Sequence, residues 1–265
     1  MLKKMLARLF GWIPWYYRVR LLQELVLTLE PEQARDAMQK TIRDLAGTMP
    51  VDQSLRFLFR LDAFLYTIQG RQSVRYDKGL HTKYRHTRYI DFFLERVQPG
   101  QRVMDIGCGG GLLAFNLAQK GAIVVGMDIS PEKILEAQQK HVHPNLTFRQ
   151  GDALKEFESG VFDCVVLSNV LEHLDQRVVF LQSVMDRYQP SLLLVRVPAF
   201  ERDWRVPLKK ELGVEWRLDP THEIEYTQES LTREMNASGL KIRHWEVRWG
   251  EFWVEVVREV ACLKS

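Results

Sequence analysis

The chain has 265 residues, of which 46% are hydrophobic and 27% are charged, and its formal net charge is +3. This composition is that of a globular protein, and no uncharged apolar stretch reaches the ~18 residues that a membrane-spanning helix requires. The three cysteines are too few and too scattered for a disulfide framework or a zinc cluster, and the start has no secretory signal pattern, so we expect a cytoplasmic location.

Residues 1–95 are predicted to form a helical N-terminal extension, or cap, and residues 96–265 a separate domain. Pro14, Pro31 and Pro50 interrupt the helical pattern of the extension, and leucines mark apolar faces on the segments that they separate. This third of the chain holds 16 Lys and Arg residues against 10 Asp and Glu residues. Mild positive charge on a helical extension does not by itself predict a nucleic-acid partner, so none is expected.

Two segments of the extension combine cations with apolar or aromatic residues. Residues 2–12 place Leu, Met, Phe and Trp side chains beside Lys3, Lys4 and Arg8, a combination that suits peripheral contact with an anionic membrane surface. The alternative is that this short segment packs against its own domain. Residues 71–88 contain six Lys and Arg residues against one acid, and such a charge run is usually a solvated face.

After Gly100 short apolar runs alternate with helical stretches, which indicates parallel βαβ units. The predicted strands are residues 102–106, 123–128, 146–150, 162–168 and 192–197, and the predicted helices are residues 112–120, 131–141 and 178–188. A helix at about 228–238 then leads into two β-rich runs that flank Gly250 and predict an antiparallel hairpin at the sheet edge. The expected fold class is therefore α/β, with a doubly wound, mostly parallel seven-stranded sheet.

Polar residues follow each of the first four predicted strands. The first strand ends in a glycine-rich turn, Gly107 to Gly111, which lets a ligand approach the main chain closely. The second ends at Asp128, 21 residues after Gly107, where a carboxylate can accept hydrogen bonds from ribose hydroxyls. Asp152 follows the third strand and Asn169 the fourth. Because the carboxyl ends of parallel strands share one edge of the sheet, these groups predict a nucleotide site there.

The register of the glycines distinguishes between two nucleotide cofactors. A dinucleotide-binding turn requires Gly or Ala at position 112, which is Leu here. Asp105 followed by Gly107, Gly109 and Gly111 instead resembles the first motif of class I S-adenosylmethionine-dependent methyltransferases. The resemblance covers about residues 95–200 and implies S-adenosylmethionine as the cofactor, with the glycines around its amino-acid part and Asp105 near its amino group. The cofactor-binding residues it implies are Asp128 at the ribose, Asp152 with Ala153 at the adenine, and Asp105, Gly107, Gly109, Gly111, Ile129 and Asn169.

The stretch Phe162–Leu174 resembles small-molecule methyltransferases, including ubiquinone-pathway O-methyltransferases and sugar methyltransferases, and residues 78–95 are similar to methyltransferases of glycan pathways. This resemblance implies methyl transfer to a small molecule or glycan precursor, with a hydroxyl oxygen as the expected acceptor. Three alternatives stay open: transfer to an amine or carboxylate, a scaffold that binds the cofactor without catalysis, and a nicotinamide-dependent dehydrogenase. The glycine register makes the dehydrogenase the weakest of these. The oligomeric state and the identity of the acceptor are not predicted.

Methyl transfer to a hydroxyl requires a group that removes its proton, most often His or a carboxylate. His222 is the first candidate because the resemblance implies that its connection, between the fifth strand and the following helix, borders the acceptor pocket as in class I methyltransferases. His173, which follows the fourth strand, is the second. Each could instead be a histidine that caps a helix or bonds to the backbone. The expected acceptor-binding residues are Lys83, Arg85, Trp204 and Tyr226. No metal site is expected, because Glu172 and His173 are adjacent and no second ligand pair has a recognisable spacing.

Overall fold

The computed structural model describes residues 11–155 and 160–259 and divides the chain into two compact units, residues 1–64 and 65–265. The division lies inside a long helix, whereas the sequence pattern changes at residue 95, so the predicted domain boundary stays a prediction. No helix of the described residues is long and apolar enough to cross a membrane.

The first unit consists of α2 (Trp15–Leu27), α3 (Pro31–Thr48) and the beginning of α4 (Val51–Tyr76). Each helix starts at or directly after one of the prolines that interrupt the sequence pattern, because proline is tolerated only in the first turn of a helix. Among the described residues 11–64, Phe59 alone is buried. The apolar side chains of this unit are therefore largely exposed in the isolated chain.

In the second unit, α5 (Lys83–Thr87) and α6 (Tyr89–Arg96) lead into the sheet. Helix α6 buries Tyr89, Phe92 and Phe93. Its last residue, Arg96, forms ion pairs with Glu246 and Glu255 at 2.8 and 2.7 Å. Helix α6 is thereby joined to the hairpin that ends the described chain.

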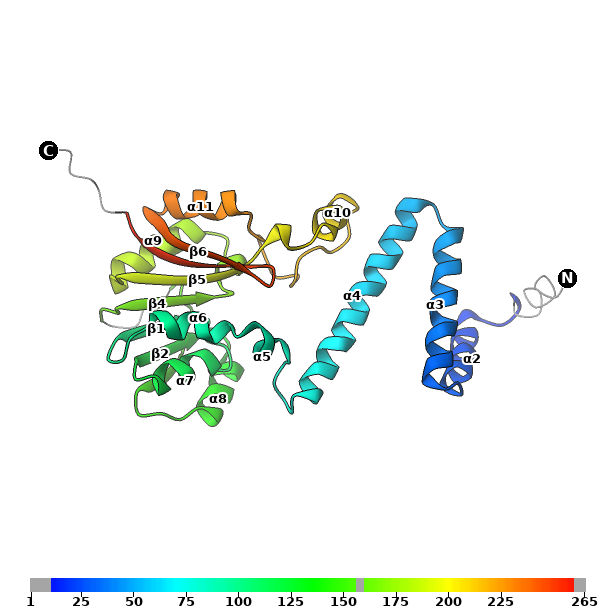
Figure 1. The fold of residues 1–265 in the computed structure, drawn as a ribbon, viewed down its shortest axis with the longest axis horizontal. Coiled ribbons are helices and arrows are strands. Elements are labelled where there is room, and N and C mark those ends of the chain that lie inside the picture. Colours follow the sequence, from blue (N-terminus) through cyan, green and yellow to red (C-terminus); the bar gives the residue numbers. More distant parts are fainter. Residues whose placement is uncertain (1–10, 156–159, 260–265) are drawn as a thin grey trace. The chain divides into compact units, whose positions relative to one another are not determined.

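The sheet has seven strands in the order β3-β2-β1-β4-β5-β7-β6, which confirms the predicted fold class (Figure 1). Strands β1 to β5 are parallel, and β7 runs antiparallel to both β5 and β6. The strands are β1 (Arg102–Ile106), β2 (Ile123–Asp128), β3 (Leu146–Gln150), β4 (Cys164–Ser168), β5 (Leu192–Pro198), β6 (Leu240–Arg248) and β7 (Glu251–Arg258). The helices between them are α7 (Leu112–Gln119), α8 (Pro131–Lys140), α9 (Arg177–Tyr188), α10 (Arg205–Glu211) and α11 (Gln228–Ala237).

Buried side chains form two clusters, one on each face of the sheet. Because successive side chains of a strand point to opposite faces, Met104 packs in one cluster with α9 and α11 while Val103 packs in the other with α6 and α7. Helices thus cover both faces, which is why the central strands are nearly continuously apolar.

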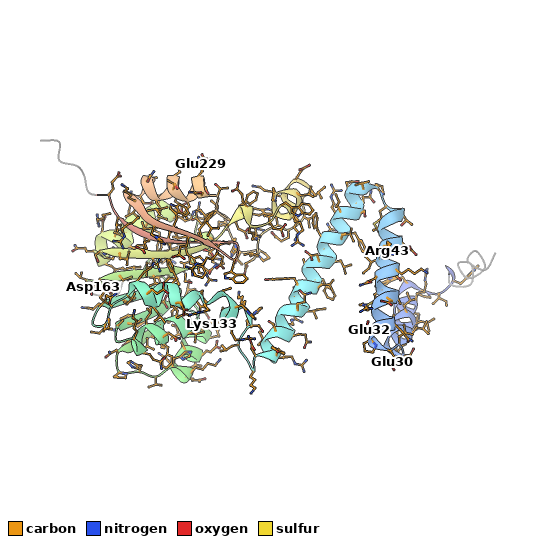
Figure 2. All side chains as sticks on the ribbon, viewed as in Figure 1. Glu30, Glu32, Arg43, Lys133, Asp163 and Glu229 are labelled. Carbon is orange, nitrogen blue, oxygen red and sulfur yellow. The ribbon has the colours of Figure 1, made fainter. Side chains whose placement is uncertain are left out.

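Strand order reverses direction between β1 and β4, since β2 and β3 lie beyond β1 and β5 lies beyond β4. In open α/β sheets a crevice forms outside the carboxyl ends of the strands at such a reversal. At the opposite, amino ends of the strands lies Asp163, labelled in Figure 2, whose carboxylate accepts a hydrogen bond from the backbone N–H of Arg102 at 2.8 Å. The crevice is the place where a functional site is expected.

Candidate functional site

Two cavities lie at the carboxyl ends of β1 and β4, and both are lined by Gly107 and Asn169. The first, of about 560 Å³, extends over the glycine-rich turn and is here named the glycine-loop cavity. The second, of about 370 Å³, extends over the ends of β2 and β3 and is named the acid-loop cavity. Gly107 has a φ of +71°, and a Cβ on it would lie 2.6 Å from Cγ2 of Val170. Only glycine fits at the junction of the two cavities.

Asp105 lines the glycine-loop cavity and is 1% exposed. Its Oδ2 atom has no hydrogen-bond partner among the described residues. Burial, together with the charge of Asp128, raises the pKa of the Asp105 carboxyl to about 7. A buried, unpartnered carboxylate next to a cavity is suited to receive a cationic group of a ligand. This fits the amino group of S-adenosylmethionine, which the resemblance assigns to Asp105.

The acid-loop cavity is lined by Asp128, Ile129, Asp152 and Ala153, all four of which were predicted to bind the cofactor. Asp128 accepts hydrogen bonds from the backbone N–H groups of Gly109 at 2.8 Å and Ser130 at 2.9 Å. These bonds fix the carboxylate where β2 ends and leave lone pairs that can accept ribose hydroxyls. Asp152 accepts from the N–H of Leu154 and pairs with Lys155.

The glycines of the turn have different structural roles. Gly109 lines the glycine-loop cavity together with Gly107. Gly111 lines neither cavity: a Cβ there would meet Cζ of Phe148 at 2.4 Å and Cβ of Ala137 at 2.9 Å. Its φ of +79° and the missing side chain let the start of α7 pack against β3 and α8. The structure therefore gives Gly111 a packing role.

Replacing Asp128 by Ala is expected to weaken S-adenosylmethionine binding at least ~10-fold, because a carboxylate that accepts two hydroxyls makes charge-assisted bonds. Isothermal titration calorimetry with S-adenosylhomocysteine measures this loss. The matched control is Asp163→Ala, which removes another carboxylate that fixes a backbone N–H, but at the amino edge of the sheet. Equal affinities of a folded Asp128→Ala variant and the control would refute the assignment.

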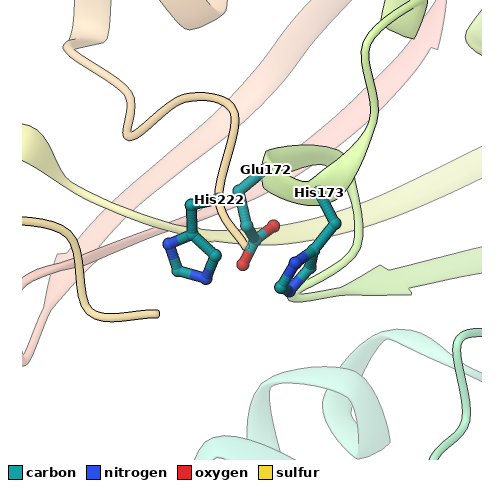
Figure 3. A group of neighbouring side chains, drawn as sticks. All are labelled: Glu172, His173 and His222. Atoms are coloured by element: carbon teal, nitrogen blue, oxygen red, sulfur yellow. The ribbon is translucent and has the colours of Figure 1, made fainter. Parts of the chain in front are cut away.

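Glu172, His173 and His222 form a cluster in which one ligand atom of each lies within 4.8 Å of the others (Figure 3). Glu172 and His173 belong to the short helix η1 (Leu171–His173), and His222 lies in the connection before α11. The carbonyl of Glu172 accepts a hydrogen bond from the N–H of Glu223 at 2.7 Å, which holds the two segments together. The fold thus unites residues that are far apart in the sequence.

The carboxyl of Glu172 is fully buried in this cluster. Its Oε1 atom accepts a hydrogen bond from Nδ2 of Asn169 at 2.9 Å, while Oε2 has no partner within the part of the chain that the structure describes. Burial raises the pKa of Glu172 to about 7. One carboxylate with two imidazoles is a donor set that divalent metals use. The expectation of no metal site rested on spacing along the chain, and it stays a prediction.

The two histidines differ in their access to the cavities. His173 lines the acid-loop cavity, and its Nδ1 lies 3.0 Å from Oγ1 of Thr221. His222 is 5% exposed, and its Nδ1 lies 3.2 Å from Oε1 of Glu225. The two rings meet edge to face, with centroids 4.7 Å apart. His173 is therefore the histidine that opens onto a cavity, whereas His222 is buried beside it.

Of the four residues expected to bind the acceptor, Lys83 lines the glycine-loop cavity, where burial and the charge of Arg196 lower its pKa. Arg85 is exposed and pairs with Asp77 at 3.2 Å. Trp204 is 72% exposed beside α10 and lines neither of the two cavities. Tyr226 is fully buried and donates a hydrogen bond to Glu234 at 2.6 Å, so it packs in the core away from both cavities.

Arg196 is a cavity residue that the sequence analysis did not identify. It lies near the end of β5, lines the glycine-loop cavity and is 7% exposed. Its guanidinium donates to both carboxylate oxygens of Glu251, at 2.6 and 2.7 Å, and lies over the ring of Tyr89. The available signal was a single charge inside an otherwise apolar strand, because a buried cation requires a partner.

The chain is similar in sequence and in fold to known methyltransferases. Residues 104–191 match a family model described as a methyltransferase domain. A ubiquinone biosynthesis O-methyltransferase from Azorhizobium caulinodans is 32% identical over 156 residues, which are 56% of this chain and 61% of that protein. One from Haemophilus ducreyi is 28% identical over 182 residues, covering 62% of this chain and 76% of that protein.

Among solved structures, the magnesium protoporphyrin IX methyltransferase from Synechocystis with bound S-adenosylhomocysteine has a TM-score of 0.54 at 24% identity. The match covers 66% of this chain and 84% of that chain, and it shows a shared fold. The matched regions span 61% of the Azorhizobium protein and less than half of some other curated relatives.

Proposed function

We propose that this chain transfers a methyl group from S-adenosylmethionine to a hydroxyl oxygen of a small molecule or glycan precursor, a proposal supported by the match of residues 104–191 to a family model described as a methyltransferase domain. The observation that carries the proposal is the pair of cavities that meet at Gly107 and Asn169, with His173 on the wall of one of them. The two cavities would hold the two parts of the cofactor, and its methyl group would lie near their junction, where the acceptor must be aligned for a displacement reaction.

The cofactor would be held by residues from three strand ends. Asp105 would pair with its amino group, Asp128 would accept the ribose hydroxyls, and Asp152 with Ala153 would border the adenine. Ile129 is 67% exposed beside the acid-loop cavity and would cover one side of the nucleoside. These assignments are supported by carboxylates that line the cavities and have lone pairs left to accept hydrogen bonds, and by the apolar side chains of Ala153 and Ile129 on the cavity wall.

When bound, S-adenosylmethionine supplies a methyl group on a positively charged sulfur. The residues of this chain would then orient the acceptor and remove its proton. His173 is the proposed base because it lines a cavity and its pKa is lowered by burial, which keeps the imidazole neutral near pH 7. Lys83, with Arg196, would hold a carboxylate or phosphate on the acceptor by charge-assisted hydrogen bonds.

The choice of a hydroxyl acceptor rests on the ubiquinone biosynthesis O-methyltransferases among the relatives and on the availability of a base. An amine acceptor would need positioning more than a base.

Titration with S-adenosylhomocysteine and with NAD tests the cofactor, and transfer of labelled methyl groups to a panel of phenols, catechols, sugars and amines tests the acceptor. NAD binding without S-adenosylhomocysteine binding would overturn the proposal, and binding without transfer to any acceptor class would favour a scaffold.

We also propose peripheral contact with an anionic membrane through the first unit. Residues 1–10 lie outside the described residues, but the same chemistry continues in Trp12, which is 93% exposed, and in α2. Helix α2 has no buried residue and carries two cations, Arg18 and Arg20, against one acid. Its exposed large side chains are Trp15, Tyr16, Tyr17, Val19, Leu21, Leu22, Leu25 and Leu27. Tryptophan and tyrosine side chains beside arginine suit the lipid headgroup region of a membrane. A helix of 13 residues is too short to span the bilayer.

Changing both Trp15 and Leu22 to Glu is therefore expected to reduce cosedimentation with vesicles that contain phosphatidylglycerol at least ~10-fold, because apolar burial and electrostatic attraction are both lost. Trp249→Glu is the matched control, since Trp249 is 68% exposed on the hairpin of the second unit. Vesicles of phosphatidylcholine alone should bind the unaltered chain weakly. Failure of the unaltered chain to bind either vesicle would exclude this membrane contact.

A further inference from the structure

The geometry points to Thr221, held by Asp219, as the positioning residue that fixes the proton on Nδ1 of His173 and leaves Nε2 free to act as the base. This inference rests on the proposed function for its catalytic meaning. Its structural content, the position of one proton, can be measured without any acceptor. The direction of each hydrogen bond follows from which groups can donate and which can only accept.

Asp219 is the end of the chain of hydrogen bonds. Its Oδ1 accepts from the backbone N–H of Thr221 at 2.9 Å and from Oγ1 of the same residue at 2.7 Å. These two hydrogen bonds lower the pKa of Asp219, so the carboxylate is ionised at neutral pH and can only accept. The single hydroxyl proton of Thr221 is therefore used in its bond to Asp219.

The contact between Thr221 and His173 then has one direction. Oγ1 of Thr221 lies 3.0 Å from Nδ1 of His173, and it has no second proton to donate. The ring must donate, so Nδ1 carries the hydrogen. A neutral imidazole has one N–H, and burial, with the charge of His222, lowers the pKa of His173. Nε2 of His173 is consequently unprotonated and able to accept a proton.

The titratable groups that face His173 are Glu172, His222 and Asp219. Burial raises the pKa of Glu225, but its hydrogen bonds from His222, Leu218 and Arg202 more than offset this and hold it below its ordinary value. Glu225 thus accepts from Nδ1 of His222, at 3.2 Å. The two histidines therefore carry their protons on the nitrogens held by Thr221 and Glu225. The hydroxyl of Thr221 is the element of this arrangement that a single substitution can remove.

In the proposed reaction the acceptor oxygen forms a bond to the methyl carbon, and its proton passes to Nε2 of His173. The electron pair of the broken carbon–sulfur bond stays on sulfur. The imidazolium that forms would be stabilised by Asp219 through Thr221 and would return its proton to water, because part of the His173 side chain is open to solvent. The wrong tautomer would present an N–H to the acceptor and could not take its proton.

Thr221→Val removes the hydroxyl at nearly constant shape, and Thr221→Ser retains it. The full chain would be labelled with ¹⁵N-histidine, saturated with S-adenosylhomocysteine and studied by long-range ¹H–¹⁵N NMR, with His173→Gln to assign the signals. The unaltered chain and Thr221→Ser are expected to show His173 protonated on Nδ1. Thr221→Val is expected to shift the proton toward Nε2. With any acceptor from the panel, kcat should fall roughly 10- to 100-fold in Thr221→Val, and KM should not change.

Two results would overturn the inference: an unaltered chain with His173 protonated on Nε2, or a Thr221→Val spectrum identical to that of the unaltered chain. Both are distinct from failure of the proposed function. Failure of the proposed function would appear as the absence of S-adenosylhomocysteine binding. The NMR spectra of the histidines can also be recorded on the chain without this ligand. Thr221 is exposed, so the valine variant is expected to fold, and its melting temperature checks this.

Discussion

Gly107→Val is expected to abolish measurable binding of S-adenosylhomocysteine, a loss of at least ~100-fold in affinity. The first carbon of any side chain at this position would lie 2.6 Å from Cγ2 of Val170, and the backbone φ of +71° disfavours a β-branched residue. The added atoms would also occupy the junction of the two cavities. Isothermal titration calorimetry measures the affinity, and circular dichroism checks that the sheet has formed.

Gly213→Val is the matched control for this variant. Gly213 has a similar φ of +65°, but a Cβ at this position would meet no atom within 4 Å, and the residue lies beyond β5 in the loop after α10. Both variants therefore have the backbone strain of a positive φ. Only Gly107→Val also has a steric conflict at the cofactor site. If the two variants lose affinity equally, the effect at Gly107 comes from backbone strain and not from the cofactor's path.

His173→Gln is expected to lower kcat by roughly 10²- to 10⁴-fold with little change in cofactor affinity, because the side chain would act only at the proton-transfer step. The neutral imidazole is the active form, and its pKa lies below the ordinary value of 6.5. With S-adenosylmethionine at saturation, kcat of the unaltered chain should therefore keep more than half of its maximum at pH 6.5 and decline below that pH. Methyl transfer to the acceptor that emerges from the panel, measured between pH 5 and 8, tests both statements.

His222→Ala and His244→Gln provide the comparison. His222 is buried beside His173 and touches Glu225, so its loss should affect kcat less, whereas His244 on β6 is distant in the fold and should be neutral. Full turnover by His173→Gln together with loss of turnover by His222→Ala would make His222 the base, as the sequence first indicated. If neither histidine matters, the acceptor is an amine or a group that is already ionised.

Local sequence pattern was sufficient to predict the architecture of the second unit. The predicted strands 102–106, 123–128 and 146–150 coincide with β1, β2 and β3, and the runs around Gly250 form the hairpin of β6 and β7. Each of these segments is specified by its own apolar periodicity and by glycines or prolines at its ends.

The predictions about side-chain position were less complete, because they depend on contacts between distant segments. Tyr226 lies in the loop expected to border the acceptor, but its hydroxyl is bonded to Glu234 on α11 and its ring is in the core. The proximity of His222 to Glu172 arises from a backbone hydrogen bond between two loops. Arg196 faces a cavity because Glu251 of the antiparallel strand β7 compensates its charge. None of these three pairings leaves a periodic signal in the sequence.

The unpartnered carboxyl of Asp105 also has a thermodynamic consequence. A cationic amino group at this position would stabilise the ionised carboxylate, whereas burial, with the charge of Asp128, otherwise raises its pKa to about 7. Association below that pH would therefore displace a proton from Asp105, and affinity would fall by up to about tenfold for each further unit of acidification. Above pH 7 no proton would be exchanged at this group. On the proposed assignment, occupancy of the cofactor site becomes a proton-linked equilibrium that responds to acidification of its surroundings.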